Sequence, residues 1–347
     1  MSGIVGHVMY AVLAEKATRQ RKLPISSLIA RHYSSYLCGS YLGCDIQTLP
    51  EAICVDTGME VGYGTVPLER SPLTGGKVRP WSLKFGDSEF RPRDIHRLFY
   101  GRSHLVFGWD LADRQHTVPW DHLADYIADV VTDAIELFGP GHRQLAYLFG
   151  WAAHIVGDSL IKSIHEGIDL FLLDGKYTQR NRPVQDLVTF HEIGRKELRL
   201  NWPDLMADLV ATPVEPIQAH YMRLAKRRGQ LGKHYPNAWT PQAEKLIWKV
   251  LGENRRYQRI RNGRLLKQLA LTKTKNGWQC DSGLSQRTGG LSYQEMIEAA
   301  EKANFRHALW QMGEAIADLF EQVVQRQPLL EHSPDDNPSW SEITKHW

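Results

Sequence analysis

Apolar residues recur at the three- and four-residue spacing of amphipathic α-helices along most of this 347-residue chain. Over 121–138, for example, Leu123, Ile127, Val130 and Ala134 fall on one helical face. The pattern predicts helices over 3–30 (interrupted by Lys-Leu-Pro at 22–24), 29–41, 93–109, 121–138, 143–173, 184–200, 203–211, 216–228, 241–271 and 292–327. The predicted fold class is therefore mainly α.

The segment 44–93 has a different residue pattern, because glycine and proline are frequent and long runs of helical hydrophobic periodicity are missing. It predicts loops and a short hairpin. A second gap falls at 276–291, and the tail 328–347 is irregular by pattern. We expect a multi-helical domain over 1–212, with the Gly/Pro-rich loop as an insertion, and a basic helical C-terminal extension over 213–347.

The composition of the chain excludes several classes of protein. With 42% hydrophobic and 23% charged residues the chain can bury a sizeable core, which excludes wholesale disorder. No window approaches the roughly 20 apolar residues that cross a bilayer. The apolar start at 3–13 is interrupted by His7 and has no basic leader, and the four cysteines form no CxxC pair. We expect a cytoplasmic protein without a signal peptide.

Charge is distributed unevenly along the chain. Between Tyr221 and Lys275 there are 15 Lys or Arg residues and only two Glu, although the whole chain has a formal charge of only +3. Aromatic residues such as Trp239 and Trp248 are interspersed among these cations. Such a segment can follow a nucleic-acid backbone, contact an anionic membrane peripherally, or form a solvated face neutralised by the acidic remainder of the chain.

The stretch 150–169 holds the main candidate chemistry. On a continuous helix His154, Asp158, His165 and Asp169 share one face, within about 60° at 100° per residue. Apolar neighbours flank that face, so it is expected to be buried, and buried imidazole and carboxylate groups in such a set suit a zinc site. The alternative is structural, since a single buried histidine is commonly a hydrogen-bonded core residue.

Length along the helix limits how these four side chains can act. Asp158 and His165 are seven residues apart, which is about 10 Å on an unbroken helix. One ion with bonds of about 2 Å does not reach both. Either two or more ions are bound or the helix breaks, with Gly157 and Gly167 as weak points.

The motif Gly150-Trp-x-x-His154-x-x-x-Asp158 resembles the core signature of the zinc-dependent phospholipase C family, whose α-helical fold is shared with zinc-dependent single-strand nucleases. Three other short segments within residues 1–200 resemble further motifs of that family and occur in the same order as in the family. They are Gly6-His7, the segment from Tyr36 that ends at Asp45, and Gly101-Arg-Ser-His104.

The resemblance implies a cluster of two or three zinc ions that cleaves a phosphoester. Asp158 would bridge two ions, and His154, His104 and Asp45 would complete one of the sites. His7 would belong to another site, and His165 with Asp169 would form the later histidine-plus-acid pair. Asp45 would also be the general base, and Arg102 would contact the phosphate.

Two departures from the family pattern leave alternatives open. Phospholipase relatives have a further histidine four to six residues after the aspartate, where this chain has Lys162, Ser163 and Ile164. His191 is a candidate replacement from a later helix. Secreted members also use a processed amino terminus as a ligand, whereas Met1 lies only six residues before His7.

The expected function is that of a zinc-dependent phosphoester hydrolase similar to phospholipase C, acting on a phospholipid headgroup or on nucleic acid. The alternatives are a single-strand nuclease of the same fold and a non-catalytic helical scaffold with a degenerate metal site. No Walker loop, GxSxG motif or adjacent His-Asp pair points to another hydrolase chemistry.

Overall fold

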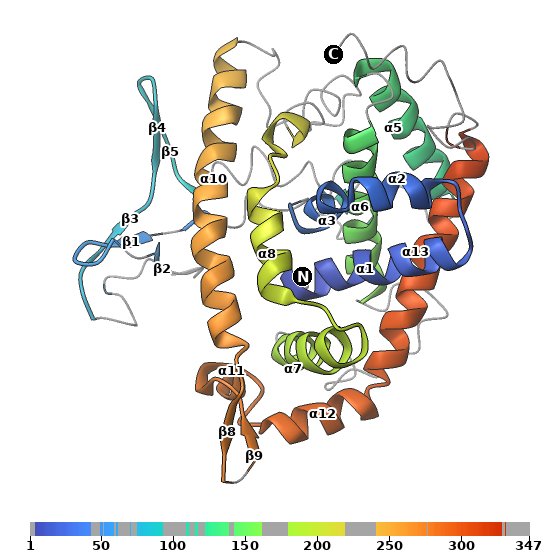
Figure 1. The fold of residues 1–347 in the computed structure, drawn as a ribbon. Coiled ribbons are helices and arrows are strands. Elements are labelled where there is room, and N and C mark those ends of the chain that lie inside the picture. Colours follow the sequence, from blue (N-terminus) through green and yellow to red (C-terminus); the bar gives the residue numbers. More distant parts are fainter. Residues whose placement is uncertain are drawn as a thin grey trace. The chain divides into compact units, whose positions relative to one another are not determined.

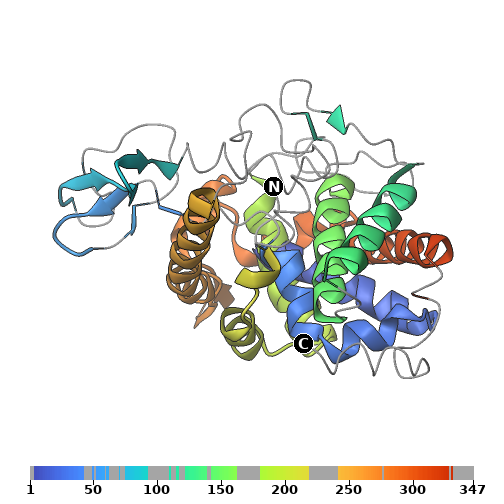
Figure 2. The same cartoon turned by 90° about the horizontal axis from the view of Figure 1, so that it is seen from above.

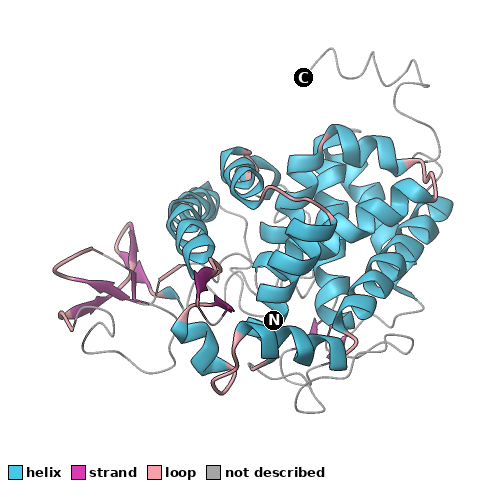
Figure 3. Cartoon of the chain, turned by 60° about the horizontal axis from the view of Figure 1, so that its bottom comes forward, coloured by secondary structure: helices cyan, strands magenta, loops and turns pink. Residues whose placement is uncertain are grey.

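The mainly α class is confirmed by the computed structural model, in which helices dominate and the strands are short (Figure 3). The structure describes residues 4–42, 49–50, 52–58, 60–61, 70, 75–92, 109–110, 115–116, 122–138, 142–161, 180–218, 241–275, 277–327 and 330.

The chain forms two compact units. The first comprises residues 1–43, 118–214 and 262–347, and the second comprises 44–117 and 215–261. The expected boundary at 212/213 lies near the junction at 214/215, and the expected C-terminal part is divided, because residues 215–261 belong to the second unit and residues 262–347 to the first.

The first unit is a bundle of helices drawn from both ends and the middle of the sequence (Figure 1). Its named helices are α1 (Ile4–Gln20), α2 (Ile25–Arg31), α3 (Tyr33–Leu42), α5 (Leu123–Phe138), α6 (His142–Leu160), α7 (Asn181–Val188), the π-helix η3 (Thr189–Glu197), α8 (Trp202–Ala211), α11 (Ser282–Arg287), α12 (Tyr293–Lys302) and α13 (Phe305–Arg326). A hairpin of β8 (Thr272–Thr274) and β9 (Gly277–Gln279) precedes α11.

The helix α1 is the centre of this bundle. It packs against α3, α6 and α13, so most of its residues are buried (Figure 2). Val5, Val8, Met9 and Leu13 all have an exposure of 1% or less. The core around α1 therefore combines a helix close in sequence, α3, with two from far along the chain, α6 and α13.

Two glycines set the close crossing of α3 and α6. A Cβ atom at Gly39 would collide with the carbonyl oxygen of Tyr147, and one at Gly150 would collide with the carbonyl oxygen of Tyr36. Only glycine allows the two backbones to approach so closely. The crossing brings the end of α3 against the segment of α6 that carries His154.

The second unit combines short antiparallel strands with most of a long helix, α10 (Pro241–Gln268). Its core contains Trp81, Leu83, Val250 and Tyr257. The strands are β1 (Ala52–Cys54), β2 (Glu60–Val61) and β3 (Val78–Pro80) in the order β2-β1-β3, then the pairs β4 (Leu83–Phe85) with β5 (Ser88–Phe90) and β6 (Trp109–Asp110) with β7 (Gln115–His116). The strands before residue 93 lie in the segment for which the sequence predicts loops and a hairpin.

Three predicted helices differ in extent from the structure. The helix expected over 143–173 ends at Leu160, and the helix expected over 184–200 becomes α7 followed by η3. The helix expected over 292–327 is divided into α12 and α13 at Asn304, which has a left-handed backbone (φ 53°). Asparagine tolerates this conformation, so an apolar period can continue across the break.

Among the described residues, no helix combines the length and the hydrophobicity that crossing a bilayer requires.

Candidate metal centre

Three of the predicted ligands meet inside the helical unit. His7 comes from α1, and His154 and Asp158 come from α6. One ligand atom from each side chain lies within 4.8 Å of those of the other two. All three residues are buried, with exposures of 7%, 0% and 2%. The structure thus brings together an imidazole–imidazole–carboxylate set from positions about 150 residues apart.

The helices place these groups by simple geometry. His154 and Asp158 are four residues apart, so they lie on the same face of α6. The next turn of α6 packs closely on α1, because a Cβ atom at Gly157 would collide with the ring of Tyr10. Tyr10 lies three residues after His7, and this contact holds the His7 face of α1 against α6.

The ring of His154 is oriented by a backbone carbonyl. Its Nδ1 lies 2.6 Å from the carbonyl oxygen of Ser40 on α3. A carbonyl only accepts hydrogen bonds, so Nδ1 carries the proton and donates, and Nε2 is the nitrogen that is left to bind a metal. Metal-binding histidines commonly have this second contact, because it fixes both the tautomer and the ring plane.

His7 is oriented toward Asp158 and His154. Its Nε2 lies 3.1 Å from Oδ1 of Asp158, and its ring centroid lies 3.9 Å from that of His154. The hydroxyl of Ser40 donates to the carbonyl oxygen of His7, so one residue of α3 contacts both histidines.

The donor set fits a zinc ion. Two ligands bound at about 2.0–2.2 Å lie at most about 4.4 Å apart, so a small adjustment of the three side chains brings them onto one ion. Two histidines and one carboxylate also leave a coordination position for water or substrate, as catalytic zinc sites require. Binding would replace the hydrogen bond between His7 and Asp158.

Asp186 on α7 is a buried carboxylate near this centre that sequence reasoning missed. It is 8% exposed, and Oδ2 lies 3.6 Å from Nε of Arg182. Burial raises the pKa of Asp186, and the charges of Arg182, Arg287 and His7 counteract the rise in part. No spacing to another ligand singles it out in the sequence, and only its burial and its interaction with His7 identify it.

His191, the alternative ligand, is not a member of the three-residue cluster. It lies in η3, where Nε2 donates to the carbonyl oxygen of Leu269 at 2.7 Å. Burial lowers the pKa of His191, which keeps the ring neutral at neutral pH. Its neighbours are the rings of Phe190 and Tyr293.

The remaining site predictions lie outside the described residues. They are Asp45, Arg102, His104, His165 and Asp169, together with Lys162. Because α6 ends at Leu160, Asp158 and His165 do not share one continuous described helix.

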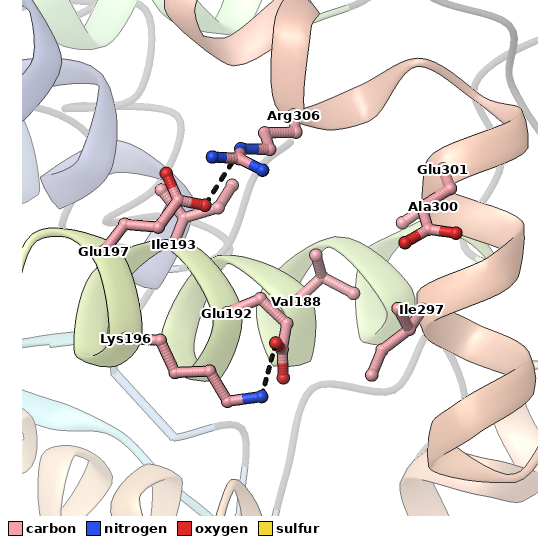
Figure 4. A pocket seen from close by; sticks show the side chains of 9 residues that line it. All are labelled: Val188, Glu192, Ile193, Lys196, Glu197, Ile297, Ala300, Glu301 and Arg306. Atoms are coloured by element: carbon pink, nitrogen blue, oxygen red, sulfur yellow. Dashed lines mark hydrogen bonds and ion pairs between the residues drawn. The ribbon is translucent and has the colours of Figure 1, made fainter.

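A pocket of about 280 Å³ lies between η3 and α12, with Arg306 at the start of α13 (Figure 4). Apolar side chains line it together with five charged ones, of which four form pairs: Lys196 with Glu192 at 2.6 Å and Arg306 with Glu197 at 2.9 Å. None of the three metal-centre residues lines it. The pocket is therefore separate from the candidate chemistry.

Comparison of the chain with protein-family models, with curated proteins and with solved structures finds no significant match in any of the three.

Proposed function

We propose that this chain is a zinc-dependent phosphoester hydrolase whose metal centre is built on His7, His154 and Asp158. The observation that supports it most directly is the convergence of these three buried side chains from α1 and α6. Buried ionisable groups are costly unless they pair or bind a metal, and the Ser40 carbonyl orients His154 as a ligand would need.

A bound zinc ion would lower the pKa of a coordinated water toward neutrality and neutralise charge on the phosphate oxygens. The residues of the chain itself present and orient the ligand atoms. His154 presents Nε2 because Ser40 holds Nδ1, and Asp158 supplies carboxylate oxygens beside His7. The apolar surroundings exclude bulk water, which strengthens each electrostatic interaction in the centre.

The complete proposed centre holds two or three zinc ions. In it Asp158 would hold more than one ion, Asp45 and His104 would hold an ion together with His154, and His165 with Asp169 would provide a later pair. Asp45 would also be the general base and Arg102 would contact the phosphate. These further roles rest on the family resemblance of the sequence. The substrate class is a phosphodiester, either a phospholipid headgroup or single-stranded nucleic acid.

A second candidate function is a non-catalytic helical scaffold. The observation that favours it is the distance of 3.1 Å between His7 Nε2 and Asp158 Oδ1, since this hydrogen bond pairs the imidazole with one of the carboxylate oxygens without a metal. The scaffold and the hydrolase differ in whether the purified protein retains a metal.

The test is metal content and phosphodiesterase activity of the full chain and of Asp158→Asn. Elemental analysis after purification and dialysis gives metal equivalents per chain, and bis(p-nitrophenyl) phosphate serves as the generic substrate. We expect at least one equivalent of zinc in the wild type, and loss of both zinc and at least about 100-fold of the activity in Asp158→Asn. Phosphatidylcholine vesicles and a single-stranded oligonucleotide then separate the two substrate sources.

His191→Gln is the matched control, because it changes another buried histidine that lies outside the cluster. We expect it to keep the zinc content of the wild type. Full zinc content in Asp158→Asn would contradict the metal centre. Zinc in the wild type without turnover of any phosphodiester would leave a structural metal and contradict the hydrolase.

A further inference from the structure

The outward face of α10 in the second unit carries a line of cations. Lys245, Lys249, Arg256 and Arg259 are all exposed, and Trp248 among them is 40% exposed. We call these five residues the α10 stripe. The opposite face of the same helix is buried through Val250, Leu251 and Tyr257. The stripe is thus the solvent side of a helix whose other side is anchored in the core of its unit.

Helical geometry makes the stripe continuous. At 100° per residue, with Lys245 as zero, the other four residues fall between about −60° and +40°. From Lys245 to Arg259 the helix rises about 21 Å. The cations therefore form a straight row along one ridge, suited to a linear polyanion.

Few internal acids neutralise the row. Within the part of the chain that the structure describes, no ion pair involves Lys245 or Arg259. Arg256 Nη1 lies 3.5 Å from Glu253 Oε2, and Lys249 Nζ donates to the carbonyl oxygen of Lys84 at 2.7 Å. By contrast, Arg255 on the same helix turns inward and pairs with Glu215 at 3.1 Å.

A glycine in the middle of the stripe is unexplained by the fold. Gly252 lies at about −20° on the same scale, is exposed, and has open space where a Cβ atom would be. Glycine weakens a helix interior, and no contact among the described residues needs its small size here. A bare backbone between Lys249 and Arg256 lets another chain approach the helix closely.

We propose that the α10 stripe binds single-stranded nucleic acid, with the cations on successive phosphates and a base stacked on Trp248. Basic grooves with interspersed aromatic side chains are the common way of holding a single strand without sequence preference. An anionic membrane fits less well, because a helix that lies in the interface buries an apolar face, and here the apolar face is already in the core. The proposal is independent of the metal centre.

The test measures binding of a fluorescein-labelled 20-nucleotide oligo(dT) to the full chain by fluorescence anisotropy. EDTA is present so that the strand is not cleaved. We expect Lys245→Gln/Arg259→Gln to weaken binding about tenfold or more. We also expect the slope of log K against log salt to become shallower by about 1.4, since each phosphate contact on a single strand contributes about 0.7. Lys273→Gln/Lys302→Gln, which removes two exposed cations elsewhere, should bind as the wild type does.

Two further variants test the stacking and the close approach separately. Trp248→Ala should lose about tenfold in affinity, whereas Trp248→Phe should retain most of it. Gly252→Leu should fold as the wild type does, because its side chain enters open space, and should weaken binding. Circular dichroism of each variant establishes that it is folded before binding is measured.

The proposal is overturned if the wild type does not bind the oligonucleotide, or if the double variant and its control bind alike. Vesicles of phosphatidylcholine with 30 mol% phosphatidylserine provide the competing partner. Cosedimentation with these vesicles that depends on the stripe, together with no oligonucleotide binding, would assign the surface to an anionic membrane instead.

Discussion

His154 and His191 are both buried histidines with one ring nitrogen against a backbone carbonyl. Their other neighbours differ, because His154 lies beside His7 and Asp158 whereas His191 lies among the aromatic rings of Phe190 and Tyr293. The chemistry of a buried histidine is therefore decided by its second contact. His154 belongs to a group that could hold a metal ion, and burial keeps the ring of His191 neutral at neutral pH.

The neutral state of His191 leads to a prediction about pH. Burial lowers its folded-state pKa below the ordinary value of about 6.5, so the unfolded chain binds more protons between these two values. The contribution of His191 to stability is complete above about pH 6.5 and is lost as the pH falls through the folded-state pKa. We expect the urea midpoint to decrease between pH 7 and 5.5.

His191→Gln removes the titrating ring and should flatten this part of the pH profile. An unchanged profile in the variant would show that another group is responsible. The measurement is made on protein from which a chelator has removed any bound metal, so that loss of metal at low pH does not contribute.

That His154 and Asp158 lie together could be predicted from the sequence, because side chains four residues apart lie on the same face of a helix. The Ser40 carbonyl could not, since every residue has a carbonyl and only the crossing of α3 and α6 selects this one. Asp186 could not either, because it belongs to a helix with no other ligand at helical spacing.

At the scale of elements, the same substitution should have opposite effects in two helices. Gly150→Ala forces a methyl group against the backbone of α3 and should destabilise the protein by about 1–3 kcal/mol. Gly252→Ala meets open space in α10 and should stabilise it by up to about 1 kcal/mol. Thermal melts followed by far-UV circular dichroism measure both.

Gly150→Ala should also reduce zinc content, because separating α3 from α6 moves the Ser40 carbonyl away from His154. A variant that keeps both its melting temperature and its zinc would refute the role assigned to the crossing.

Apolar periodicity locates helices but not their interruptions. The period over 292–327 continues through Asn304, where one left-handed residue separates α12 from α13. The segment η3 is a π-helix instead of a continuation of the α-helix. The indole of Trp202 stacks on the ring of Phe190 and donates a hydrogen bond to the carbonyl oxygen of Phe190 at 3.1 Å. A contact that joins two helices in space leaves no signal in the local pattern.

For the whole molecule, the division into two units follows contacts and not sequence order. The segment after residue 261 returns to the first unit because α13 supplies a wall of the core around α1. The boundary between the units at residue 261 could not be predicted from the charge pattern, because the basic segment continues from 221 to 275. Composition predicts a basic segment, but packing decides where a unit begins.

All three residues of the metal centre belong to the first unit, so metal binding should stabilise that unit. Saturation with zinc at 100 times the dissociation constant adds about 2.7 kcal/mol. We expect chelation to lower the melting temperature of the wild type and to leave that of Asp158→Asn unchanged. Equal shifts in both proteins would place the bound metal elsewhere.

The central position of α1 also has a consequence for synthesis. Twelve of its 17 residues are buried, yet α6 and α13, which cover it, follow more than 120 and nearly 300 positions later. At about 5–20 residues per second, a ribosome needs roughly 15–60 s to make the last of these partners. Until α6 and α13 have been made, the faces of α1 that they cover stay exposed to solvent, and the group of His7, His154 and Asp158 is incomplete until Asp158 has been made. We expect these apolar faces of α1 to be a binding site for chaperones during synthesis.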